Sequence, residues 1–105
     1  MKFPIERIIA RKDLNPRLLY GNIEGLANDI KLHGQREPVK VGFCNENKMF
    51  YLFDGFRRLE CAKLNNEEYL DCGNSSVITY ESIPSDKEIR DKIYFYALRT
   101  EQSKN

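Results

Sequence analysis

Residues 49–62 read Met-Phe-Tyr-Leu-Phe-Asp-Gly-Phe-Arg-Arg-Leu-Glu-Cys-Ala, an apolar run that stops at Asp-Gly and continues as a helix with two arginines. The five consecutive apolar or aromatic residues from Met49 to Phe53 are typical of a strand covered on both faces. Gly55 permits a sharp turn and a close approach of the backbone. The sequence therefore predicts a buried strand, a tight turn and a helix in immediate succession.

The start of this helix has the properties of an anion site. The first amide groups of a helix lack partners within it, and together with the helix dipole they attract phosphate. Arg57 and Arg58 lie beside these amides, and an arginine can bind phosphate bidentately. Glu60, Glu67 and Glu68 leave a second interpretation open, in which both arginines form surface ion pairs that contribute about 0 to 1 kcal/mol each.

Length and composition limit the classes of protein to consider. The chain of 105 residues is 41% hydrophobic, which predicts one domain over residues 1–105 with its own core. The net charge is only +1, so any contact with DNA must come from a local basic patch. The sequence shows no signal peptide and no apolar run of about 18 residues or more, so we expect no membrane partner and a cytoplasmic setting.

The three cysteines do not predict a metal site. Cys44, Cys61 and Cys72 lack a Cys-x-x-Cys spacing, and His33 is the only histidine available as a further ligand. We therefore expect no metal ion held by these residues, and free thiols typical of a reducing compartment.

Apolar spacing and turn residues predict an α+β fold, a small mixed sheet with helices, in the order β-α-β-β-α-β-α. The predicted strands are residues 3–9, 39–43, 49–53 and 77–80, and the predicted helices are residues 22–34, residues 56–64 and a last helix after Ser85. The two central strands are expected to pair antiparallel through the polar loop 45–48. Ser85 and Glu88 have the spacing of a capping box.

The last helix is apolar around nearly its whole circumference. One face carries Ile89, Ile93, Tyr96 and Ala97, and the other sides carry Tyr94, Phe95 and Leu98. Packing against the sheet explains only part of this pattern. Docking on a second copy or on a partner protein is the other interpretation, and the sequence leaves both open.

Three segments, together with the order of elements, resemble the ParB/sulfiredoxin-like domain over nearly the whole chain. The segments are Asn15-Pro16-Arg17, residues 33–39 (His-Gly-Gln-Arg-Glu-Pro-Val) and residues 54–62. In that family, segments like Gly34-Gln35-x-x-Pro38 and Gly55-x-Arg57-Arg58-x-x-x-Ala62 are the nucleotide-binding boxes. The resemblance therefore implies a nucleotide or phosphate site formed by Gly34, Gln35, Asp54, Gly55, Arg57 and Arg58, with Arg17 approaching the same cleft.

The residues leave the roles of several of these positions open. Asp54 suits a metal ion or an arginine, but Asp before Gly also simply suits a turn. Gln35 either binds a base or ribose, as the resemblance favours, or merely follows a helix end. Arg17 either reaches the cleft or is an exposed loop residue. We interpret His33 as a helix-end residue and not as a catalyst.

The same resemblance implies several activities, because the superfamily includes CTP-dependent DNA clamps, sulfiredoxins, serine kinases and nucleases. Sulfiredoxins carry their reactive cysteine in a Gly-Cys-His-Arg corner, and Phe56 and Arg57 stand here in place of Cys-His, so sulfinic acid reduction is not expected. The kinase segment Asp-Gly-His-His-Arg keeps only Asp54, Gly55 and Arg58 here, so ATP chemistry stays open without support.

The partition proteins of this family carry Gly-Glu-Arg-Arg in the second box. Phe56 replaces their carboxylate, which argues against hydrolysis and metal handling. Those proteins continue into a DNA-reading and a dimerisation module, for which we expect no room in a chain ending at Asn105. Their third segment, Glu-Asn-x-x-Arg, is only faintly matched by residues 101–104, so a truncated chain is an alternative.

We therefore expect a stand-alone module that binds a nucleoside triphosphate, CTP or ATP with Mg²⁺, and acts in DNA transactions or partner docking in a plasmid or phage setting. The expected partners are the nucleotide, DNA through a local basic patch, and a second copy or another protein through the last helix. The alternative is an NTPase, phosphotransferase or DNase in which Asp54, Glu60 or a residue not identified from the sequence acts as the catalytic base with a divalent ion. A third interpretation is a protein that has kept the fold and lost the ligand.

Overall fold

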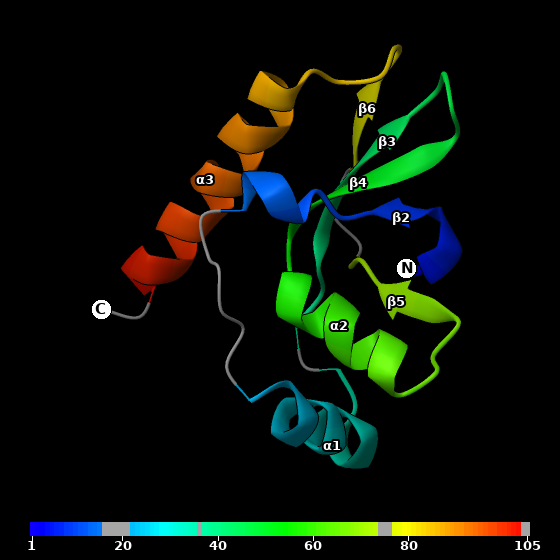
Figure 1. The fold of residues 1–105 in the computed structure, drawn as a ribbon, viewed down its shortest axis with the longest axis vertical. Helices are drawn as coiled ribbons and strands as arrows, with labels where there is room; N and C mark the ends of the chain where they lie inside the picture. The colour runs from blue at the N-terminus through cyan, green and yellow to red at the C-terminus, as the bar shows by residue number, and fades with distance from the viewer. Residues whose placement is uncertain (16–21, 36, 74–76, 104–105) are drawn as a thin grey trace.

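A four-stranded mixed sheet is the centre of the molecule, in a computed structural model that describes residues 1–15, 22–35, 37–73 and 77–103 (Figure 1). The strand order is β2-β4-β3-β6, formed by β2 (Ile8–Ile9), β4 (Met49–Asp54), β3 (Lys40–Cys44) and β6 (Ile78–Tyr80). β2 runs parallel to β4 and β6 runs parallel to β3, whereas β3 and β4 are antiparallel. The predicted α+β class with a small mixed sheet is confirmed.

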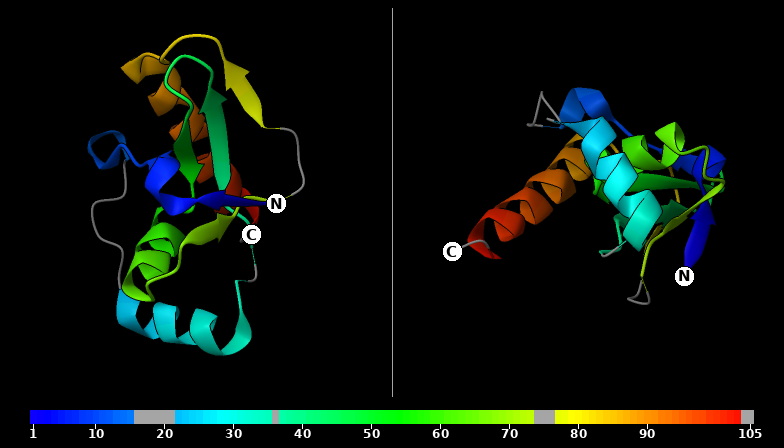
Figure 2. Two further views of the ribbon diagram at one scale, coloured as in Figure 1. Left: turned by 90° about the vertical axis from the view of Figure 1, so that its right-hand side faces the viewer. Right: turned by 90° about the horizontal axis from the view of Figure 1, so that it is seen from below.

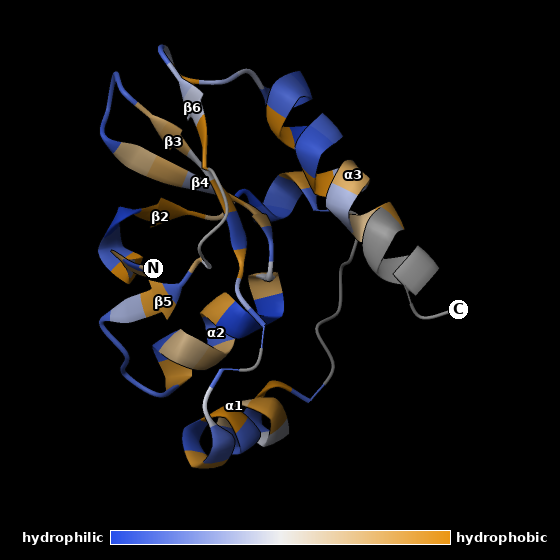
Figure 3. Cartoon of the chain, turned by 180° about the vertical axis from the view of Figure 1, so that it is seen from behind, coloured by the Kyte–Doolittle hydropathy of each residue, from blue (hydrophilic) through white to orange (hydrophobic). Residues whose placement is uncertain are grey.

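The central strands form because their residues are apolar along nearly their whole length. Tyr51, Leu52 and Phe53 in β4 are buried, as expected for a strand covered on both faces. The predicted polar loop 45–48 is the turn of the β3–β4 hairpin, and Figure 3 shows it as a hydrophilic tip between more hydrophobic strands.

The part of the chain that the structure describes contains three α-helices. They are α1 (Ile23–His33), α2 (Phe56–Leu64) and α3 (Asp86–Ser103). α1 packs against α2, and α3 packs against β4 and the short 3-10 helix η2 (Lys12–Leu14) (Figures 1 and 2). The predicted helix starts are confirmed: the Asn22 side chain accepts a hydrogen bond from the Gly25 amide, and Ser85 and Glu88 form the capping box of α3.

The prediction of one strand over residues 3–9 is wrong, because the structure divides this segment between two sheets. β1 (Lys2–Pro4) pairs antiparallel with β5 (Tyr69–Asp71) in a separate two-stranded sheet. The backbone hydrogen bonding to the segment of β5 continues one residue past Pro4, where the Ile5 amide donates to the Glu68 carbonyl, and the 3-10 helix η1 (Ile5–Arg7) then turns the chain towards β2. No strand is predicted from the sequence at β5, because its three residues are too few to show an alternating pattern.

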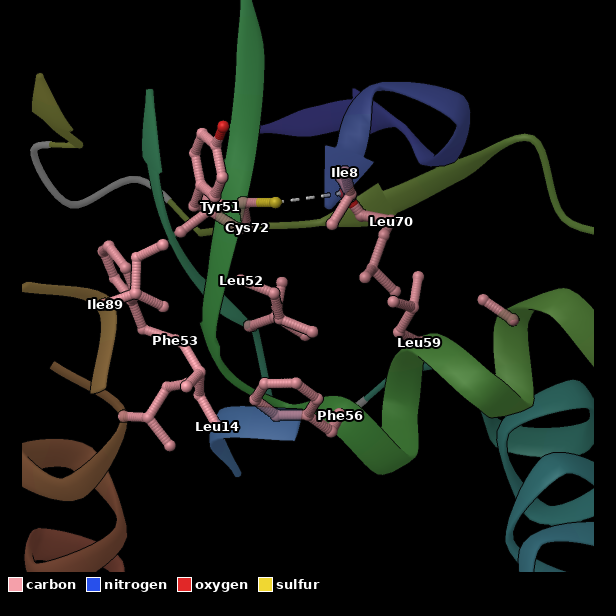
Figure 4. Packing of buried hydrophobic residues seen from close by; sticks show 14 of the residues in the cluster. Ile8, Leu14, Tyr51, Leu52, Phe53, Phe56, Leu59, Leu70, Cys72 and Ile89 are labelled. Atoms are coloured by element: carbon pink, nitrogen blue, oxygen red, sulfur yellow. Dashed lines mark hydrogen bonds between the residues drawn. The ribbon is translucent and has the colours of Figure 1, made fainter. Parts of the chain in front are cut away.

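The core lies between the main sheet and the helices. Its fully buried side chains come from the β3–β4 region, α2 and α3 and are Val39, Cys44, Leu52, Phe53, Leu59, Cys61 and Ile89. Figure 4 shows several of them pointing into one cluster. All three cysteines are buried and free of disulfides, in accord with the prediction of free thiols.

The second half of α3 extends away from the body of the molecule (Figure 2). Ile89 and Ile93 are buried, whereas Tyr94, Phe95 and Leu98 are between 46% and 58% exposed. Within the described ranges, no helix has the length and hydrophobicity that crossing a bilayer requires.

Candidate functional site

The corner between β4 and α2 brings together residues from three segments. β4 ends at Asp54, and Gly55 turns the chain into α2. The register of the hairpin pairs Asp54 with Lys40 at the start of β3. Glu37 lies three residues before Lys40 and contacts Arg58 on the first turn of α2. We refer to Glu37, Lys40, Asp54, Gly55 and Arg58 as the corner.

Gly55 gives the corner its shape. Its backbone is left-handed, with φ 102° and ψ 29°, and it offers no side chain to cap α2. A Cβ atom at this position would overlap the side chain of Val39. Glycine is therefore required both by the left-handed backbone and by this close contact. Because no side chain caps the start of α2, the amides of its first turn remain suited to an anion.

The two arginines of α2 have different surroundings, as expected for successive helix positions about 100° apart. Arg58 Nη2 donates to Glu37 Oε2 at 2.7 Å. The acidic partner of Arg58 is therefore Glu37, and not one of the three glutamates expected from the sequence, which are Glu60, Glu67 and Glu68. Arg57 lies near Cys61, and the buried Arg57 Nε has no hydrogen-bond partner among the residues that the structure describes.

Asp54 lies half-buried beside Arg58. Burial raises the pKa of its carboxyl above the ordinary value of 3.8, whereas the charge of Arg58 and the amide of Gly55 lower it. Glu37 also raises this pKa, and Lys40 lowers it. The charges of Asp54 and Arg58 are close enough to interact, and a role of Asp54 in orienting this arginine stays a prediction. Among the described side chains, no three His, Cys, Asp or Glu residues gather in a way that would hold a metal ion.

Gln35 holds the segment that carries Glu37. Its Nε2 donates to the carbonyl oxygens of Glu37 at 2.7 Å and Asp71 at 2.9 Å, and its Oε1 accepts from the Asp71 amide. The Gln35 amide thus bonds to the backbone of β5 as a neighbouring strand would. Gly34 ends α1 with φ 80°, as predicted, and connects the helix to this segment.

Two predicted features fall outside the described part of the chain. Arg17 belongs to residues 16–21, which are not described, so its approach to the cleft stays a prediction. The faint match to the third box involves residues 101–104, whose side chains are likewise outside the description.

Glu37 and Lys40 complete the corner, although neither stands out in the sequence. Glu37 occupies an unspecified position of the Gly34-Gln35-x-x-Pro38 box. Regular pairing from the hairpin turn would set Lys40 opposite Phe53, but a bulge after Lys40 shifts its partner to Asp54. The position of Glu37 inside the Gly34-Gln35-x-x-Pro38 box is the signal that could have identified it. Lys40 could not be predicted from the sequence, because the bulge changes its strand partner.

Phe56 belongs to the core and not to the corner. Its ring points into the cluster that contains Leu14 and Leu52 (Figure 4). The thiols offer no nucleophile nearby: burial raises the pKa of Cys61, and burial raises that of Cys72 to about 11. A buried thiol with a raised pKa carries little thiolate at neutral pH.

Solved structures share this fold, although no protein-family model and no curated protein sequence matches the chain. The C-terminally truncated chromosome-partitioning protein ParB from Caulobacter crescentus, crystallised with CTP-gamma-S, matches 94% of this chain with a TM-score of 0.67 and 18% identity. Sulfiredoxin from Arabidopsis thaliana matches 89% of it with a TM-score of 0.62 and 17% identity. The chain has the ParB/sulfiredoxin fold.

The ParB/sulfiredoxin fold confirms the resemblance that the three sequence segments predict. The chain spans 52% of the ParB chain and 94% of the sulfiredoxin chain. At these identities the likeness shows the fold alone, and one fold hosts several functions.

Proposed function

We propose that this ParB/sulfiredoxin-fold chain is a nucleotide-binding module that holds the phosphates of a nucleoside triphosphate at the corner. The observation that carries the proposal is the start of α2, where a left-handed Gly55 leaves the helix without a side-chain cap and Arg58 lies on the same turn. Uncapped helix amides and a guanidinium group are both donors that favour phosphate oxygens.

The positive side chains around the start of α2 support an anionic ligand. Lys40 and Arg58 lie near the half-buried Asp54, and Arg57 adds a third positive charge on the same helical turn as Arg58. Arg58 makes one described hydrogen bond, to Glu37, and a guanidinium has further N–H groups that can donate to phosphate.

CTP is the first candidate for the nucleotide, because the similar ParB was crystallised with CTP-gamma-S. ATP is the second, and we expect Mg²⁺ to accompany either triphosphate as a counter-ion of the phosphates. The second box of this chain differs from that of the partition proteins, and carboxylates lie beside the arginines. The identity of the nucleobase must therefore be measured.

Calorimetric titration with CTP, ATP, GTP and UTP, each with and without Mg²⁺, tests the proposal. We expect one triphosphate to bind at micromolar concentration, and Arg58→Ala to weaken that binding by about tenfold to a hundredfold because a charge-assisted hydrogen bond is lost. Arg90→Ala is the matched control, since Arg90 is exposed on α3 and its charge acts on Asp13, which is not a residue of the corner. Binding that is equal in all three proteins would contradict the site, and no binding at all would contradict the function.

A phosphotransferase or DNase is the second candidate, favoured by the raised pKa of Asp54 beside Arg58. Glu60 is the other candidate for the catalytic base. Its buried Oε1 forms an ion pair with Lys12 Nζ at 2.5 Å, and the geometry of this contact is not that of a regular hydrogen bond. Release of phosphate or cleavage of DNA that is lost in Asp54→Asn would favour this candidate over a binding module.

The expected DNA and protein partners stay predictions. Binding of duplex DNA at two salt concentrations measures the first, because phosphate contacts weaken steeply with salt. Light scattering with and without the triphosphate measures association through the exposed face of α3.

A further inference from the structure

The arginine best placed for phosphate already has an anionic partner within the chain. Arg58 Nη2 donates to Glu37 Oε2 at 2.7 Å, and the two residues come from different segments, 21 positions apart. The Arg58 side chain is 26% exposed and that of Glu37 is 74% exposed. The carboxylate therefore reaches the guanidinium from the solvent side, as an anionic ligand would.

The backbone of Glu37 is fixed, whereas its carboxylate is free to leave. The Glu37 carbonyl accepts a hydrogen bond from Gln35 Nε2, and Gln35 is held in turn by the backbone of Asp71. An exposed side chain changes rotamer on the picosecond to nanosecond scale. Departure of the carboxylate from Arg58 thus needs no change in the fold of the segment.

We infer that Glu37 is an internal competitor for the anion site, whose carboxylate occupies Arg58 until a phosphate group displaces it. The inference rests on the proposed function and assigns Glu37 a part in setting affinity. A ligand gains from Arg58 only if its phosphate interacts with the guanidinium more strongly than a carboxylate does. The ligand class that meets this condition is the multiply charged phosphate chain of a nucleotide.

The opposite role for Glu37 makes the opposite prediction. If the carboxylate orients Arg58 towards the ligand, removal of its charge weakens binding. If it competes for Arg58, removal of its charge strengthens binding. The sign of the change in affinity therefore separates the two roles.

Glu37→Gln keeps the shape of the side chain and removes the charge. We expect CTP, or whichever of the four triphosphates binds the wild type, to bind this variant about threefold to tenfold more tightly, because the exchange of an ion pair is no longer required. Glu67→Gln is the matched control, since Glu67 is an exposed carboxylate beyond the opposite end of α2. Circular dichroism and thermal unfolding establish that both variants are folded.

The same substitution in an Arg58→Ala background tests whether Glu37 acts through Arg58. We expect the gain to fall to less than about twofold there, because the residues of one interaction are not additive. Unchanged or weaker binding by Glu37→Gln, an equal gain in Glu67→Gln, or a full gain in the Arg58→Ala background would each overturn the inference while wild-type binding upholds the proposed function. Failure of every variant to bind would overturn both.

Discussion

Arg11 and Arg58 are almost equally exposed, at 29% and 26% of their side chains, but they use their donors differently. Arg11 binds both carboxylate oxygens of Asp13, at 3.1 and 2.9 Å, and Asp86 at 2.9 Å, which ties η2 to the start of α3. Arg58 makes one described hydrogen bond to an exposed glutamate. The first arginine is saturated by its own chain, and the second keeps donors for a ligand.

The backbone is more constrained at the corner than at Arg11. Arg11 has an ordinary negative φ of −81°, whereas the corner depends on the left-handed Gly55 against Val39. The corner thus combines a constrained backbone with an arginine that makes a single described hydrogen bond, and the Arg11 cluster combines a less constrained backbone with an arginine bound to two carboxylates. We infer that this contrast distinguishes a binding site from a structural ion-pair cluster.

The largest effect is expected from Gly55→Ala. The substitution adds a left-handed strain and an overlap with Val39, which together should lower the free energy of unfolding by about 2 to 5 kcal/mol. Gly34→Ala also meets a positive φ but has open space around the new Cβ, so it should cost only the backbone part, about 1 to 3 kcal/mol. Urea unfolding of both variants measures the difference, and an equal cost would show that the contact with Val39 is unimportant.

Reciprocal substitutions test the two arginines. Arg58→Ala should weaken triphosphate binding by about tenfold to a hundredfold and change the free energy of unfolding by less than about 1 kcal/mol. Arg11→Ala should leave the affinity unchanged and lower the free energy of unfolding by up to about 1 kcal/mol. Calorimetry and urea unfolding of the same two proteins give both quantities. Loss of binding in Arg11→Ala would remove the distinction between the regions.

A smaller effect is expected from Asp54→Asn. Burial raises the pKa of Asp54, so the folded chain binds this proton more tightly than the unfolded chain does. The contribution of Asp54 to stability therefore rises as the pH falls from neutral through its raised pKa to below 3.8. At neutral pH, Asp54→Asn should be more stable than the wild type by less than about 1 kcal/mol, since the group is only half-buried. The difference in the free energy of unfolding between Asp54→Asn and the wild type should shrink in acid. Urea unfolding of both proteins at neutral pH and at a pH below 3.8 measures it.

Asp13→Asn should show the opposite pH dependence. The hydrogen bonds from Arg11 lower the pKa of Asp13, so its stabilising effect is present above the ordinary value of 3.8 and is lost as the pH falls through the lowered pKa. The melting temperature of this variant should lie below that of the wild type at neutral pH, and the two should converge in strong acid. Parallel curves would show that the Asp13 charge contributes nothing.

The sequence predicts what is decided by neighbours along the chain. The apolar spacing from Ile23 and the cap at Asn22 locate α1, and Ser85 with Glu88 locates the start of α3, because each signal lies within one or two turns. The Asp-Gly-Phe-Arg-Arg segment locates the turn into α2 for the same reason.

Contacts between distant segments account for the misses. β5 forms because it pairs with β1, with Leu70 opposite Phe3. Its three residues carry no pattern from which this pairing could be predicted. Glu37 enters the candidate site only because Gln35 and Asp71 fix its segment, and the bulge after Lys40 changes a register that counting alone would assign. Local patterns therefore predict most of the elements and three of the five corner residues, Asp54, Gly55 and Arg58, whereas the places of Glu37 and Lys40 depend on contacts between distant segments.

The geometry of α3 has a mechanical consequence. Ile89, Ile93 and the bond from Arg11 to Asp86 hold the base of this helix, while its far end projects from the body. At about 1.5 Å per residue, the length from Ile93 to Ser103 is about 15 Å. A tilt of about 10° at the base would displace the tip by about 3 Å. A rotation of α3 about its held base would therefore move the tip further than the residues near η2 and β4.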